Sequence, residues 1–352
     1  MMKPVLLRLT TIYFKNYYQV ANNWITLLYG FNMKKKEITI NILIPVYNVE
    51  EYVEECIDSI LAQIDSKASV VIMNDASTDS SASIIEGYKK HPQVDVFDAP
   101  HNRGLSATRN ALFDMAQADY VWFIDSDDLL YENAYSSVIS QLEKLNSDVL
   151  SADYVSLRGK KEVRKKAFIG QANKNLDNIN NSFLDNIIKN NSNHVWNKVF
   201  RREVIQDIRF KEGLNFEDIS YMTDISLNYF QYSYLKKPII KYREREGSIL
   251  KNLDEKYVND YLFAFTYRIE NYQRDEKEDS YHYLLYKVYK RYIGLLERIA
   301  KNGQPDLLKD TYDQYNSYFS ELYLIVNKEL PLHQRIILNI RNSKLKSILK
   351  GI

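Results

Sequence analysis

The sequence has few of the features that mark secreted, nucleic-acid-binding or membrane-spanning proteins. Cys56 is its only cysteine, which excludes an internal disulfide and a cysteine zinc site and favours a reducing, cytoplasmic compartment. The 47 basic and 46 acidic side chains nearly cancel, so no nucleic acid is expected as a partner. No apolar run reaches the ~18 residues of a membrane-spanning helix. The composition is that of an ordinary globular protein.

Apolar, β-branched segments alternate with helical patterns in the first third of the chain. The predicted elements, in chain order, are strand 38–46, helix 53–64, strand 70–73, helix 80–89, strand 94–97, helix 105–117 and strand 120–124. Asn48 and Glu51 resemble a capping box at the start of the first helix. The alternation predicts an α/β fold with a mostly parallel sheet and helices on both faces.

The alternation fades in the second half of the chain. The charge run at residues 158–166 is interpreted as a solvated loop or hairpin, with a phosphate clamp as the alternative. Near the end the apolar spacing becomes helical. We therefore expect a basic apolar extension (1–36), an α/β domain (37–250) and a helical domain (251–352) with a basic amphipathic end.

Both ends of the chain combine basic and apolar residues. Residues 1–36 and 331–352 contain no acidic side chain. Such segments suit an anionic membrane surface, which would make the protein peripheral on the inner face of the cell membrane. The alternatives are that the C-terminal stripe packs on the helical domain, and that translation begins at Met33.

Three carboxylates, Asp125, Asp127 and Asp128, follow the last strand of the alternation. Like charges this close repel one another unless a cation neutralises them. Mg²⁺ and Mn²⁺ prefer oxygen ligands and bridge carboxylates to substrate phosphates, so the cluster predicts a metal site that holds a diphosphate. The alternative is that Asp127 or Asp128 only caps the next helix.

Polar side chains also follow the other predicted strands, whose carboxyl ends should meet at one edge of the sheet. Asp75 would accept hydrogen bonds from a base or ribose, or else cap the following helix. Arg103 and Arg109 lie on either side of Gly104. Their guanidinium groups suit phosphate, with solvent exposure as the alternative.

Four segments together resemble the family 2 nucleotide-sugar glycosyltransferases, which have the GT-A fold. They read ILIPVYNVEEYVEECIDSILAQ, VIMNDASTDSS, HNRGLSATRNAL and YVWFIDSDDLL, and the resemblance covers about residues 38–248. It implies inverting transfer of a sugar from a nucleoside-diphosphate donor, usually a UDP-sugar, with Mg²⁺ or Mn²⁺ on the diphosphate. The chain departs from the family at Asn74 and Ala76, where relatives often have Asp and Gly.

The resemblance implies roles for residues on the donor side. Asp75 would bind the base, Asp125-Ser126-Asp127 matches the Asp-x-Asp motif, and Asp127 and Asp128 would lie nearest the metal. The other implied donor-side residues are Pro45, Val46 and Tyr47 at the nucleoside, Arg109 near the donor, and Arg245 and Ser248 in a late loop over the phosphates.

The resemblance also implies residues on the acceptor side. Glu217 and Asp218 match a Glu-Asp motif, in which Asp218 would take the acceptor proton and Glu217 would support it. The alternative for this pair is an ordinary helix start. Trp196 and Lys198 lie where relatives place acceptor-side residues, and core packing is the alternative for Trp196. The histidines show no metal-ligand spacing and are interpreted as incidental.

With these motifs, the resemblance implies a metal-dependent glycosyltransferase, hexosyl- or N-acetylhexosaminyl-type, that acts on a saccharide or lipid-linked acceptor in cell-surface polysaccharide biosynthesis. A sugar nucleotidyltransferase would need a glycine-rich phosphate loop after the first strand, and residues 45–52 contain no glycine. A non-catalytic nucleotide-sugar-binding relative would not need both acidic motifs intact. These two classes are the alternatives.

Overall fold

The computed structural model of the 352-residue chain describes most of the sequence after residue 36. The described residues are 37–159, 161–168, 172, 174–177, 182–244, 253–272 and 279–349. The extension predicted at residues 1–36 lies outside them, as does the predicted domain boundary at residue 250.

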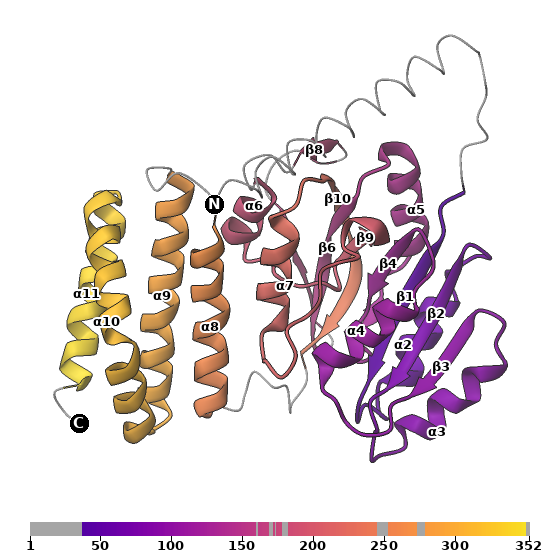
Figure 1. Cartoon of the computed structure of the whole chain (residues 1–352), viewed down its shortest axis with the longest axis horizontal. Coiled ribbons are helices and arrows are strands. Elements are labelled where there is room, and N and C mark those ends of the chain that lie inside the picture. Colours follow the sequence, from indigo (N-terminus) through magenta and orange to yellow (C-terminus); the bar gives the residue numbers. More distant parts are fainter. Residues whose placement is uncertain are drawn as a thin grey trace, which may run out of the picture. The chain divides into compact units, whose positions relative to one another are not determined.

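The first part of the chain has the predicted alternation of strands and helices (Figure 1). The elements are β1 (Ile40–Val46), α2 (Val53–Leu61), β2 (Ala68–Asn74), α3 (Ser81–Glu86), a 3-10 turn (Gly87–Lys90), β3 (Val94–Asp98), α4 (Leu105–Met115) and β4 (Tyr120–Phe123). β1 pairs in parallel with β2 and β4, and β2 pairs in parallel with β3. The residues that follow these strands therefore share one edge of the sheet.

The rest of the sheet is mixed rather than mostly parallel. The elements are β5 (Leu129–Leu130), α5 (Ala134–Leu145), β6 (Val149–Arg158), β7 (Lys161–Lys165), β8 (Asn175–Asp177), α6 (Ser182–Asn190), β9 (Lys198–Arg201), a 3-10 turn (Arg202–Val204), α7 (Glu217–Ser226) and β10 (Gln231–Arg243). The strand order is β3-β2-β1-β4-β9-β6-β10-β5. β9 is antiparallel to both neighbours, whereas β6 and β10 are parallel. β7 pairs antiparallel with β6, which is the hairpin expected for the charge run.

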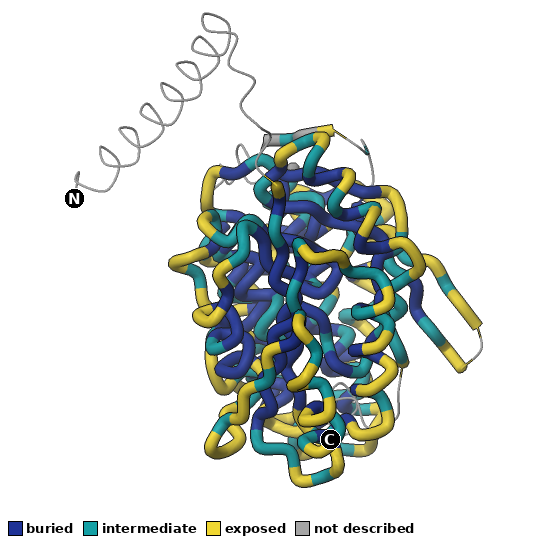
Figure 2. Tube along the Cα trace, turned by 90° about the vertical axis from the view of Figure 1, so that its right-hand side faces the viewer, coloured by how far each residue is buried: buried dark blue, intermediate teal, exposed yellow. Residues whose placement is uncertain are grey.

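Helices form the end of the described chain, as expected. They are α8 (Glu255–Asn271), α9 (Asp279–Lys301), α10 (Pro305–Glu329) and α11 (Leu332–Leu349). The Asp254 side chain caps α8 by accepting a hydrogen bond from the backbone N of Tyr257 at 2.7 Å. Buried residues run through the interior, and exposed ones gather on outer helix faces and loops (Figure 2). Among the described residues, no helix has both the length and the apolar content needed to cross a bilayer.

Two turns at the carboxyl edge of the sheet differ from simple expectation. Asn48 does not cap α2, because its φ is 50° and its side-chain oxygen accepts a hydrogen bond from the backbone N of Thr78 at 2.8 Å. The capping-box prediction is therefore wrong, and Asn48 instead ties together the loops that follow β1 and β2. Ala76 has a φ of 57°, a left-handed conformation that glycine adopts more readily.

Candidate active site

A buried arginine joins the two acidic motifs. The Arg109 side chain on α4 is only 3% exposed, and its Nη2 donates a hydrogen bond to Asp125 Oδ1 at 2.6 Å. Its Nη1 donates to Glu217 Oε1 at 2.5 Å. Asp125 follows β4 and Glu217 begins α7, so one guanidinium holds two distant segments together. Arg109 is therefore a buried link, which excludes the solvent-exposed alternative, and its place near the donor stays a prediction.

The three aspartates after β4 have different environments. Asp125 and Asp127 are partly exposed, whereas Asp128 is fully buried. Asp128 Oδ1 accepts a hydrogen bond from the backbone N of Arg243 at 2.9 Å, and its Oδ2 has no hydrogen-bond partner among the described residues. Burial, reinforced by the charges of Asp127 and Asp125, raises the pKa of Asp128 well above its usual value.

The two predicted metal ligands, Asp127 and Asp128, differ in their exposure to solvent. Asp128 is buried and supports β10 through its Oδ1, and its role as a metal ligand stays a prediction. Asp127 is partly exposed, and its metal role stays a prediction. Neither residue caps α5, whose N-cap is Asn133. The described residues contain no group of three His, Cys, Asp or Glu side chains placed to hold a metal alone.

Asp218 lies in the first turn of α7, beside Glu217. This motif is therefore both a helix start and one of the two acidic motifs that Arg109 joins. The side chain of Asp218 is 22% exposed, and its Oδ2 lies 3.7 Å from Nδ1 of His194, which is 34% exposed. Burial raises the pKa of Glu217, although Arg109 pulls it down. The spacing of His194 in the sequence indicated no role, yet the fold places it next to the predicted base.

The side chains of Trp196 and Lys198 are buried. Trp196 is 4% exposed, and the rings of His194 and Tyr242 stack on it with centroids at 4.5 and 5.4 Å. Lys198 is fully buried, and its Nζ donates hydrogen bonds to the carbonyl oxygen of His194 at 2.6 Å and to Asn197 Oδ1 at 2.9 Å. Trp196 therefore follows the core-packing alternative, and the acceptor-side roles of both residues stay predictions.

Burial also changes the ionisation of Lys198. Because the ammonium loses its water, the pKa of Lys198 falls to about 7, although the charge of Asp218 opposes the shift and that of Arg268 adds to it. Asp218 therefore acts electrostatically on Lys198 without a direct bond between them in the described structure.

The predicted donor-side residues fall into two groups by exposure. Pro45 and Val46 are buried strand residues and Ser126 is 7% exposed, so their side chains do not line an open pocket. Tyr47 leaves β1 with 46% of its surface exposed and remains accessible to a nucleoside. Arg245 and Ser248 lie outside the described residues.

Asp75 organises a loop at the same edge. It is 3% exposed, and its Oδ1 and Oδ2 accept hydrogen bonds from the backbone N of Arg103 and Gly104, each at 2.8 Å. Gly104 has a φ of 84° where α4 begins, a conformation that favours glycine. Asp75 does not cap α3, which begins after Ser80. Its contact with a base stays a prediction.

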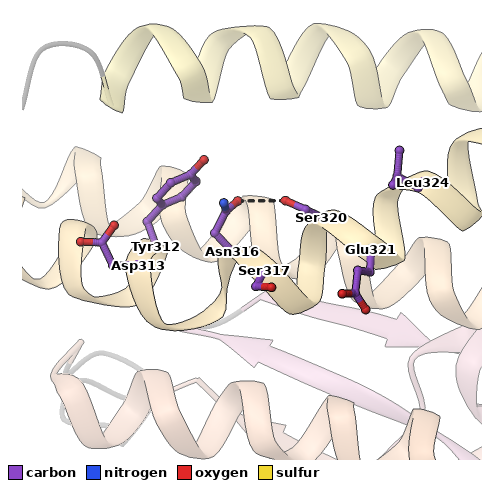
Figure 3. Close-up of a pocket in the computed structure, with 7 residues that line it drawn as sticks. All are labelled: Tyr312, Asp313, Asn316, Ser317, Ser320, Glu321 and Leu324. Atoms are coloured by element: carbon purple, nitrogen blue, oxygen red, sulfur yellow. Dashed lines mark hydrogen bonds between the residues drawn. The ribbon is translucent and has the colours of Figure 1, made fainter.

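Two surface hollows are lined by residues other than Arg109 and the acidic side chains that it joins. One, of about 480 Å³, is lined entirely by residues of α10, from Tyr312 to Leu324 (Figure 3). It contains none of the predicted site residues. The other, of about 530 Å³, lies between α4 and residues 209–212, with Arg103 on its lining. The second hollow therefore borders the loop that Asp75 holds.

Comparisons with known proteins agree with the resemblance. Residues 41–209 match the family described as Glycosyl transferase family 2. Glycosyltransferase GlyA of Streptococcus pneumoniae is 28% identical over 280 residues, covering 77% of this chain and 39% of GlyA. The minor teichoic acid biosynthesis protein GgaB of Bacillus subtilis is 26% identical over 226 residues, covering 61% of this chain and 24% of GgaB. The chain thus spans much less than two thirds of these two relatives.

A solved structure confirms the fold. The crystal structure of S. aureus TarS 1-349 in complex with UDP-GlcNAc superimposes with a TM-score of 0.67 at 22% identity, covering 89% of each chain. This similarity confirms the expected GT-A arrangement.

Proposed function

We propose, on the premise that this chain belongs to glycosyl transferase family 2, that it transfers N-acetylglucosamine or a related sugar from a UDP donor, with inversion, to a hydroxyl of a surface-polysaccharide acceptor. The structure of TarS with UDP-GlcNAc supports the donor, and the name of GgaB supports the acceptor class. The observation that carries the proposal is the Arg109 link, because it brings the acidic cluster and the Glu217-Asp218 pair to one place.

In the proposed reaction, Asp218 is the general base. Its partly exposed carboxylate takes the proton of the acceptor hydroxyl, whose oxygen attacks the anomeric carbon from the face opposite the diphosphate. The bond between that carbon and the diphosphate oxygen breaks, and UDP leaves with the electron pair. Glu217, paired with Arg109, keeps the first turn of α7 in position rather than taking the proton.

The residues after β4 fit a divalent cation on the diphosphate. Burial first, and then the charges of Asp128, Asp127 and Asp125, raise the pKa of Tyr242 to about 12. The three aspartates that follow β4 also contribute to this shift, and a cation would offset their charge. Asp127, with Asp125, would hold Mn²⁺ or Mg²⁺ together with donor phosphates, and few protein ligands are needed in such sites. When bound, the ion would neutralise charge on the leaving UDP.

Release of UDP from UDP-GlcNAc in the presence of Mn²⁺, compared with UDP-glucose and GDP-mannose, tests this proposal. Asp218→Asn is expected to lower the rate by at least about 10²-fold, the usual contribution of a general base, while UDP affinity changes little. Asp114→Asn, an exposed acid on α4, is the matched control and should keep the wild-type rate. A wild-type protein that binds UDP-GlcNAc without turnover would support a non-catalytic relative. A comparable rate in Asp218→Asn would exclude it as the base.

The outer face of α11 supports attachment to a membrane surface, where a lipid-linked acceptor would be located. Leu338 and Leu345 are buried against the other helices, so one side of α11 packs as the alternative expected. Leu332, Ile336 and Ile340 are 65%, 49% and 64% exposed. The helix has no acid, and its Lys344 and Lys346 are exposed, whereas Arg341 pairs with Glu297 of α9 at 2.8 Å. Exposed apolar residues flanked by bases favour an anionic bilayer.

A further inference from the structure

Helix α8 lies beside α7, the helix that carries the proposed base (Figure 1). Asp260 Oδ2 accepts a hydrogen bond from the backbone N of Asn215, just before α7, at 2.8 Å. At the other end, the hydroxyl of Tyr267 donates to Asp224 Oδ1 at 2.5 Å. The position of α7 against the sheet therefore depends on a helix that follows the family-matched region in the sequence.

Arg268 lies at the centre of this contact and is 2% exposed. Its Nη2 donates to the carbonyl oxygen of Ile219 and its Nε to Thr223 Oγ1, both at 2.9 Å. Its Nη1 donates to Asn193 Oδ1 at 2.8 Å. One guanidinium therefore joins the first two turns of α7 to the residue that precedes His194.

Arg268 has no carboxylate within ion-pair distance among the described residues, although it is buried. Burial, followed by the charge of Arg291, lowers the pKa of Arg268 to about 9, whereas the charge of Asp218 raises it. An unpaired buried cation is costly, and here the nearby anion is the proposed base. The unfavourable free energy of burying this cation therefore arises where α8, α7 and the loop that contains His194 meet.

The loop is fixed from its other side as well. The buried ammonium of Lys198 donates hydrogen bonds to the carbonyl oxygens of Ser192 at 3.1 Å and His194 at 2.6 Å. The backbone around His194 is thus anchored by Lys198 from β9 and by Arg268 from α8. Of these two anchors, only Arg268 also binds α7.

We infer that Arg268 is a positioning residue for sugar transfer: by tying α7 to the loop at residues 192–198, it sets Asp218 against His194 at the acceptor side. This inference rests on the proposed function, because it takes Asp218 to be the base. Helix α8 of the C-terminal helical segment then helps to position the active-site residue Asp218. A shift of about 1 Å in a reacting group can cost about 10²-fold in rate.

The test compares Arg268→Met and Arg268→Lys in the full chain. UDP release from UDP-GlcNAc with Mn²⁺ gives kcat and KM, and UDP affinity is measured separately. Arg268→Met is expected to lower kcat by about 10²-fold while KM and UDP affinity stay within about twofold. Arg268→Lys should recover part of kcat, because an ammonium restores the charge but cannot span three acceptors in a fixed fork. Arg298→Met is the matched control, since Arg298 lies on α9 and bonds to Tyr257 of α8 at 2.7 Å.

A folded Arg268→Met protein with wild-type kcat would overturn the inference. So would a variant whose kcat and UDP affinity fall together, because that result indicates general loss of structure. If Arg268→Met does not fold, Asn193→Leu removes the bond from Arg268 to the loop, together with a weak 3.5 Å bond to Asn191, and leaves the bonds from Arg268 to α7 in place. Wild-type kcat in that variant would also overturn the inference. A wild-type chain that releases no UDP would refute the proposed function itself, which distinguishes the two failures.

Discussion

Replacing Arg109 by methionine is expected to destabilise the fold by about 3–5 kcal/mol near neutral pH, the usual cost of leaving a buried charge without its partner. The Arg109 side chain is 3% exposed and Glu217 is 12% exposed, so Glu217 would be left as a buried, unpaired carboxylate. Asp125, at 26% exposed, is better solvated and should contribute less. Most of the loss should therefore come from the bond to Glu217.

The loss should also depend on pH. Burial raises the pKa of Glu217, and removing Arg109 takes away the charge that lowers it, so this pKa should rise further. An acid with a raised pKa binds more protons in the folded state than in the unfolded state, so stability falls as pH rises through that pKa. The difference between wild type and Arg109→Met should therefore be larger at about pH 8 than at about pH 5.

Urea unfolding followed by tryptophan fluorescence at both pH values would measure this difference. Arg209→Met is the matched control, because Arg209 pairs with Asp114 of α4 at the same 2.6 Å but is 40% exposed. It should cost no more than about 1 kcal/mol. The double variant Arg109→Met with Glu217→Gln should recover part of the lost stability. Equal urea midpoints for wild type and Arg109→Met, or a difference that does not vary with pH, would refute the reasoning.

Asp127→Ala should abolish the Mn²⁺-dependent part of UDP binding, measured by calorimetry, and an unchanged dependence on Mn²⁺ would exclude Asp127 from the metal site. Burial lowers the pKa of Lys198 to about 7 in the folded state, so above that pH the unfolded chain binds more protons at Lys198 than the folded chain does. Wild-type stability, relative to Lys198→Met, should thus rise between about pH 7 and pH 10 by up to about 1.4 kcal/mol per unit in urea unfolding; a flat difference would contradict this. Ile336→Glu with Ile340→Glu should abolish flotation with anionic phosphatidylglycerol vesicles. Phe263→Glu, 40% exposed on α8, is the control and should still float. A double variant that still floats would contradict α11 as the membrane-binding surface, and a double variant that changes only the oligomeric state would indicate that this face binds another copy of the chain.

The amino-acid sequence by itself determined the elements and motifs of the first half. Apolar spacing and turn residues act over a few positions, so the strands from β1 to β4 and their connecting helices follow from local pattern. Parallel pairing then brings the ends of those strands to one edge. The reversal at β9 was not predictable, because a short strand records no direction in its periodicity.

Only the tertiary structure decided what each site residue contacts. Arg109 meets Glu217 across 108 positions, and Arg268 meets Asn193 across 75. Trp196 and Lys198 are buried for the same reason, since segments distant in the sequence cover them. Burial and charge pairing arise between such segments, and no spacing within one of them encodes these contacts. The sequence therefore determined which residue types meet at the sheet edge, and packing determined which of them remain accessible.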